Sequence, residues 1–141
     1  MDDNPDLTLE AIEKQQWGDA PAEASYLVRT VHELRRKPVG QWGVEDLRIL
    51  LGQDVGTEVI LPYALTVLER EPLAEGDYYP GDLLAAVLQL PVVYWQKHQT
   101  CSDRLEHIVS AVESMARETS AHSDDVLLSK IRIYRERRTQ E

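Results

Sequence analysis

Hydrophobic residues recur at intervals of three and four positions along most of the chain, as they do on helices that bury one face. This spacing predicts helices over roughly 27–37, 44–51, 55–70, 83–90, 102–120 and 126–138. The side chains expected to face the core are Leu27, Val28, Val31, Leu34, Leu47, Leu50, Leu51, Val59, Ile60, Leu61, Ala64, Leu65, Leu68, Leu105, Ile108, Val109, Val112, Met115, Val126, Leu127, Ile131 and Tyr134. Alternation typical of strands is scarce, and the only β-like stretch, residues 90–94, contains a proline.

Proline and glycine mark several of the expected helix ends. Lys37 precedes Pro38 and is therefore disfavoured in the α region, so the first helix should stop there. Residues 40–43, which hold two glycines, form a linker, and Gly52 is placed to end the second helix. Pro62 lies inside the third run, which must either kink or restart near that residue.

Short polar residues stand where the later helices should begin. Asp82 is placed as an N-cap or first-turn residue, Ser102 or Asp103 can cap the fifth helix, and residues 123–125 can cap the last. Residues 94–95 fall in a short connector. The sequence therefore predicts an all-α protein, a single compact bundle of about six or seven helices.

Composition narrows the class of protein. The chain has 141 residues, a net charge of -10 and an isoelectric point near 4.8. Such a field repels phosphate backbones and attracts cationic surfaces, so we expect a cationic protein partner and no nucleic acid. No apolar run is long enough to span a membrane, and the acidic N-terminus lacks an apolar stretch that could serve as a signal peptide. A single cysteine fits the reducing cytoplasm.

The charge is distributed unevenly. Residues 1–25 hold seven acids against one base, and residues 129–141 hold five bases against two acids. We interpret the basic end as favourable charge at a helix C-terminus rather than a nucleic-acid arm. The basic residues 35–37 are expected to serve a helix end in the same way. The three tryptophans, Trp17, Trp42 and Trp95, are each expected in the core more than on the surface.

The components of an enzyme site do not converge in this sequence. The histidines are His32, His98, His107 and His122, with no pair at the spacing of a helical zinc site. Cys101 with His98 or His107 is the remaining nucleophile–base candidate. Glu75, Asp77 and Asp82 do not match the register of a calcium-binding loop. We expect no enzyme activity, no cofactor and no metal.

The most informative segment is residues 72–84, PLAEGDYYPGDLL. It places two tyrosines and three carboxylates among glycines and prolines, and no lysine or arginine falls between residues 71 and 91. Such an acidic, aromatic loop is typical of a contact surface. We predict that a partner binds at Glu75, Asp77, Tyr78, Tyr79 and Asp82. Asp82 and the two glycines can also serve as helix start and turn residues, which leaves an architectural role open for them.

Several segments resemble a family of small bacterial immunity proteins from contact-dependent growth inhibition (CDI) systems. The matching segments are YLVRTVHELRRKP at 26–38, VEDLRILLGQ at 44–53, LPYAL at 61–65 and the loop at 72–84. Gly43 stands where the family more often has a Ser or Thr cap, and Thr57 replaces a usual leucine. The resemblance divides the expected single domain, 1–141, into an acidic segment at 1–22, a family-like core at 25–90 and a helical pair at 102–138.

The resemblance implies a non-enzymatic protein that binds and neutralises a cognate toxin domain by occluding its active site. The resemblance implies a basic toxin, with a nuclease as one candidate activity, which agrees with the acidic charge of this chain. Two alternatives stay open. One is a helical adaptor with a partner that is not a toxin, and the other is an enzyme or metal-dependent module. The oligomeric state does not follow from the sequence.

Overall fold

The computed structural model describes residues 6–118 and 126–139, which form eight α-helices and one 3-10 turn. The helices are α1 (Leu9–Glu13), α2 (Tyr26–Arg35), α3 (Val44–Gly52), α4 (Thr57–Arg70), α5 (Asp82–Leu88), α6 (Val92–Lys97), α7 (Gln99–Glu118) and α8 (Val126–Thr139), with the 3-10 turn at Val39–Gln41. The described residues contain no strand, only an isolated bridge between Glu75 and Pro80. The all-helical prediction is confirmed.

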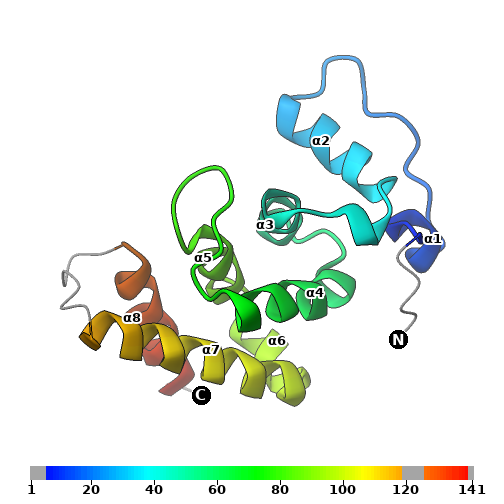
Figure 1. The fold of residues 1–141 in the computed structure, drawn as a ribbon. Helices are drawn as coiled ribbons and strands as arrows, with labels where there is room; N and C mark the ends of the chain where they lie inside the picture. Colours follow the sequence, from blue (N-terminus) through cyan, green and yellow to red (C-terminus); the bar gives the residue numbers. More distant parts are fainter. Residues whose placement is uncertain (1–5, 119–125, 140–141) are drawn as a thin grey trace.

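Helix α4 lies at the centre of the fold and packs against α3, α5 and α7 (Figure 1). Helix α5 contacts both α3 and α8, while the short α6 packs against α7. Leucines from these helices form most of a single core, in which Leu50, Leu65, Leu83 and Leu105 are fully buried. The apolar periodicity of the sequence thus becomes one continuous interior, because α3, α7 and α8 pack on α4 or α5, and α2 and α6 extend the packing through α3 and α7.

Local capping explains where the early helices begin. The Thr8 hydroxyl accepts a hydrogen bond from the Ala11 amide, and the Ser25 hydroxyl accepts one from Val28, both at 3.2 Å. At α3 the capping residue is Gly43, and its amide donates instead to the Asp46 carboxylate at 3.0 Å. The Asp46 carboxylate thus satisfies the amide of the capping residue, which is the reciprocal half of a capping box, while Gly43 has no side chain to accept from the first turn.

Two expected boundaries were wrong, and one alternative at a third is excluded. Helix α4 runs unbroken from Thr57 to Arg70, so of the two alternatives at Pro62, a kink or a restart, the restart is ruled out. Helix α7 begins at Gln99, so Ser102 lies inside it, buried, and accepts a hydrogen bond from Arg138 at 2.7 Å. The connector expected at residues 94–95 is helix α6, which begins directly after Pro91. Proline at a helix start costs nothing, since its missing N–H would have no intrahelical partner there.

Several inward positions also differ from expectation. Leu27, Val28, Met115 and Val126 are exposed to 37–57% of their full areas. The proposed cap at 123–125 and the expected helix end at residue 120 lie outside the described residues.

The basic end of the chain holds α8 against α7. Arg135 pairs with Glu113 at 2.7 Å and with Glu106 at 3.1 Å, and the Tyr134 hydroxyl donates to Glu106 at 2.9 Å. The hydrogen bond from Arg135 lowers the pKa of the Glu113 carboxyl. These contacts give the basic residues a specific structural role that helix-dipole reasoning alone did not predict.

Truncating a central core residue tests this packing. Leu65→Ala should lower the free energy of unfolding by about 2–5 kcal/mol, because it removes buried methyl groups and leaves a cavity around α4. The matched control is Val93→Ala on α6, where the side chain is 53% exposed and the change should stay within about 0.5 kcal/mol. Urea denaturation followed by circular dichroism measures both. Equal effects would contradict the assigned core.

Candidate partner-binding surface

The loop between α4 and α5 is organised around the buried carboxylate of Asp82. This residue is only 4% exposed, and it opens α5. One carboxylate oxygen accepts the Gly76 amide at 2.7 Å, and the other accepts the Tyr78 amide at 3.0 Å. The Tyr79 amide approaches the second oxygen at 3.5 Å. Because backbone amides converge on it, the carboxylate fixes the shape of the loop from inside.

Two residues of α3 hold the loop from the outside. Glu45 accepts the Asp77 amide at 2.9 Å and forms a bidentate ion pair with Arg48. The hydrogen bond from Arg48 holds the pKa of the Glu45 carboxyl below its usual value, against the opposing effect of burial. The Arg48 guanidinium in turn lies 4.5 Å from the centre of the Tyr78 ring. Helix α3 thus positions both the backbone and the aromatic tip of the loop.

The loop glycines are required by close packing. Gly81 has φ +91°, and a Cβ there would lie 2.5 Å from a methyl group of Leu127 on α8. A Cβ at Gly76 would overlap the Glu45 carboxylate, which would have to shift from its contact with the Asp77 amide. Glycine at 81 therefore suits the backbone conformation, and glycine at 76 leaves room for the Glu45 contact.

The residues predicted to bind a partner share this loop but differ in exposure. Tyr78 is 70% exposed, and Glu75 and Asp77 are exposed beside it. Tyr79 is half-buried and packs against the core, whereas Asp82 lies in the interior. A hollow of about 150 Å³ adjoins the loop, lined by Arg48, Gly52, Tyr78, Tyr79, Asp82, Ala85, Ala86, Gln89 and Lys130. The structure thus presents an aromatic and acidic tip on a support of polar contacts.

The contacts that tie the N-terminal segment to α2 were not predicted from the sequence. Arg35, expected only to cap the C-terminus of a helix, is 1% exposed, pairs with Glu13 and donates to the Gln15 carbonyl at 2.7 Å. Arg36 pairs with Asp19 at 2.9 Å. The available signal was the opposition of an acidic segment at 1–25 and a basic trio at 35–37.

The tryptophans were predicted with mixed success. Trp95 is 2% exposed and belongs to the core, and Trp42 packs against the core while its indole donates to the Leu34 carbonyl at 3.3 Å. Trp17 is 42% exposed, so its expected place in the core was wrong. Its ring rests over the guanidinium of Arg35, 4.2 Å away, and meets His32 edge-on.

Among the residues that the structure describes, the Cys101 thiol forms no hydrogen bond with His98 or His107, the two histidines considered as its catalytic base. Burial raises the pKa of the half-buried Cys101 thiol, which disfavours the reactive thiolate. His98 stacks on Tyr94, and His107 bonds through Nδ1 to the Asp103 carbonyl. Across residues 6–118 and 126–139, no three His, Cys, Asp or Glu residues gather as metal ligands. The helices in these ranges are also too short or too polar to cross a membrane.

A braced, exposed loop of aromatic and acidic side chains is typical of a protein that binds other proteins. Residues 11–105, well over half of the chain, match the family described as CDI immunity proteins. The chain belongs to this family, and the resemblance seen in the sequence is confirmed. No curated protein and no solved structure matches it. CDI immunity proteins are non-enzymatic toxin inhibitors, so the chain is not an enzyme.

The position of Asp82 predicts the effect of removing its charge. Asp82→Asn should lower the free energy of unfolding by about 1–3 kcal/mol. The substitution replaces one of the two carboxylate oxygens by an NH₂ group, which cannot accept a hydrogen bond from Gly76 or Tyr78. Amide hydrogen exchange should accelerate at Gly76 and Tyr78. Asp77→Asn, at an exposed carboxylate of the same loop, is the matched control and should change neither property. Unchanged exchange in Asp82→Asn would contradict the assigned role.

The lowered pKa of Glu45 predicts a dependence of stability on pH. A carboxylate with a depressed folded-state pKa stabilises the fold above the ordinary glutamate pKa of about 4.3. This contribution disappears as the pH falls through the lowered value. Glu45→Gln should therefore be less stable than the parent at neutral pH, with a gap that narrows in acid. Urea titrations across pH measure it, with exposed Glu71→Gln as control; a gap independent of pH would contradict the prediction.

Proposed function

We propose that this immunity protein neutralises a basic toxin domain, such as a nuclease, by placing the loop at residues 72–81 over the toxin's active site. Family membership implies a cognate toxin as the partner. The observation that carries the finer proposal is the exposed Tyr78 tip, flanked by Glu75 and Asp77 and braced by α3. Aromatic residues surrounded by a polar rim are frequent centres of binding energy in interfaces.

Charge supports a cationic partner. The chain carries a net charge of -10, and the loop presents Glu75 and Asp77 with no basic residue in its own sequence. A protein surface that handles phosphate groups is cationic, so an acidic loop is complementary to it. Occupation of such a surface excludes the substrate. Acidic residues that pair with a base, such as Glu113 with Arg135, are neutralised within the chain and contribute less to this attraction.

Rigidity supports tight binding. Gly76, Asp77 and Tyr78 all donate their amides to carboxylates of the same chain, Asp82 or Glu45. The loop therefore holds its shape before a partner arrives, which reduces the conformational entropy lost on binding. Within this proposal Glu75, Asp77, Tyr78 and the exposed part of Tyr79 contact the toxin, while Asp82 positions them. We place the complex in the cytoplasm, where the single cysteine stays reduced.

Reversing one loop charge tests the electrostatic part of the proposal. Asp77→Lys should slow association with the cognate toxin domain by roughly tenfold at low salt, and the deficit should shrink at high salt. Asp103→Lys is the matched control, since Asp103 is an exposed acid on α7, away from the loop. Surface plasmon resonance gives both rates. Equal effects of the two variants would reject the loop as the contact surface.

Removing the aromatic tip tests the apolar part. Tyr78→Ala should weaken the complex by about thirtyfold, as truncation of a central aromatic residue costs about 2 kcal/mol. The loss should appear mainly as faster dissociation and should restore toxin activity in a titration with the variant. Val93→Ala on α6, where the side chain is 53% exposed and lies in neither the loop nor α2, controls for general loss of exposed apolar surface. Full inhibition by Tyr78→Ala at parent concentrations would sink the assignment of Tyr78.

A further inference from the structure

Exposed apolar side chains gather at the beginning of α2. Tyr26, Leu27 and Val28 are 75%, 37% and 42% exposed, and Trp17 nearby is 42% exposed. Val31 and Leu34, which continue the same helical face, are 6% and 5% exposed. The apolar face of α2 is thus longer than the surface that the fold provides to cover it. Figure 1 shows the first turns of α2 standing clear of the other helices.

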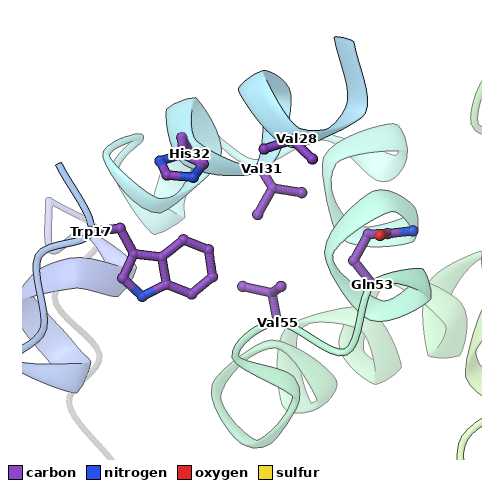
Figure 2. A pocket seen from close by; sticks show the side chains of 6 residues that line it. All are labelled: Trp17, Val28, Val31, His32, Gln53 and Val55. Atoms are coloured by element: carbon purple, nitrogen blue, oxygen red, sulfur yellow. The ribbon is translucent and has the colours of Figure 1, made fainter. Parts of the chain in front are cut away.

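This face borders a groove of about 170 Å³. Figure 2 shows its wall of Val28, Val31 and His32 from α2, with the Trp17 ring on one side and Gln53 and Val55 on the other. The apolar members point into the same space from three separate segments. A cavity of about 150 Å³ lined by apolar residues admits a benzene molecule. The groove is therefore large enough for one aliphatic or aromatic side chain.

Polar contacts hold the Trp17 wall in place. The indole lies over Arg35, which is anchored by Glu13 and by the Gln15 carbonyl. His32 meets the indole edge-on and bonds through Nδ1 to the Gly18 carbonyl at 3.1 Å. The contacts on both sides of Trp17 keep its ring half-exposed. A groove with a fixed wall binds a side chain with little further ordering.

We propose that this groove receives an apolar side chain from the cationic surface of the toxin domain, as a second contact beside the loop. The inference rests on the proposed function. Asp54 lies between two lining residues, Gln53 and Val55, and is exposed, so the rim favours a cationic neighbour. A second copy of this chain would bring another net charge of -10 to the same place, which opposes self-association.

The groove and the loop are close enough for one partner. Glu45 of α3 holds the loop, and Gln53, which directly follows α3, lines the groove. Eight residues of helix separate them by roughly 12 Å. A typical interface covers about 800 Å² on each partner, which spans this separation. The toxin therefore contacts both ends of α3 at once.

Val28→Asp tests the groove, with calorimetric titration of the same toxin domain as the measurement. The variant should bind at least tenfold more weakly at both low and high salt, because the lost contact is apolar. An added acid would strengthen a purely electrostatic contact with a cationic partner, so a loss separates the two effects. Ile133→Asp on α8 is the matched control, because Ile133 is also β-branched and its side chain is 54% exposed. Its affinity should stay within about threefold of the parent.

A second variant guards against effects on folding. Gln53→Phe fills the groove from an exposed position without removing core packing, and it should weaken binding to the same degree. Thermal unfolding of each variant confirms the fold. Parent-like affinity of both groove variants, with Asp77→Lys impaired, overturns the groove and leaves the proposed function intact. No binding by the parent overturns both. A dimer in light scattering that Val28→Asp dissociates assigns the groove to a second copy and also overturns the inference.

Discussion

The buried carboxylate of Asp82 is the interaction on which the most distinctive part of this structure depends. Burying a carboxylate is costly unless donors surround it, and here the donors are backbone amides of the loop that precedes it. The loop must therefore fold back over the start of α5. That return brings the Asp77 amide to Glu45 on α3 and brings Gly81 against Leu127 on α8. One desolvated charge thus couples the loop to three helices.

Charge is used in two different ways across the molecule. Arg35 with Glu13, Arg104 with Glu69 and Arg135 with Glu113 join segments distant in sequence. In each pair the arginine offsets a negative charge that would otherwise add to the negative potential around the protein. Glu75 and Asp77, by contrast, remain exposed on a loop that has no base of its own. The loop therefore keeps acidic side chains exposed, whereas the acids of these three pairs are bound to arginine.

Much of the fold follows from periodicity, and the exceptions have identifiable physical causes. The faces of α3 and α4 were predicted correctly, since leucine at helical spacing has no better place than the interior. The same reasoning failed at Leu27 and Val28, because periodicity shows which face is apolar and not whether another element covers it. The expectations for Arg35 and Trp17 also failed, because the N-terminal segment folds back onto α2 and brings these two side chains together. The loop at 72–84 was recognisable as a candidate contact surface from its composition. The family of the chain was recognisable from the order of its four matching segments.

The sequence by itself determined the helical class, most of the leucine core, the acidic character and the family of immunity proteins. These properties are local or additive, since propensity, spacing and charge can be read along the chain. Only the tertiary structure decided which residues of the acidic loop face outward. The sequence proposed both Asp77 and Asp82 as contact residues and left a helix-start role open for Asp82, yet only Asp77 is exposed, and Asp82 is enclosed by amides. The packing of α3 and α8 around the loop makes that distinction, because burial depends on neighbours that no local pattern specifies.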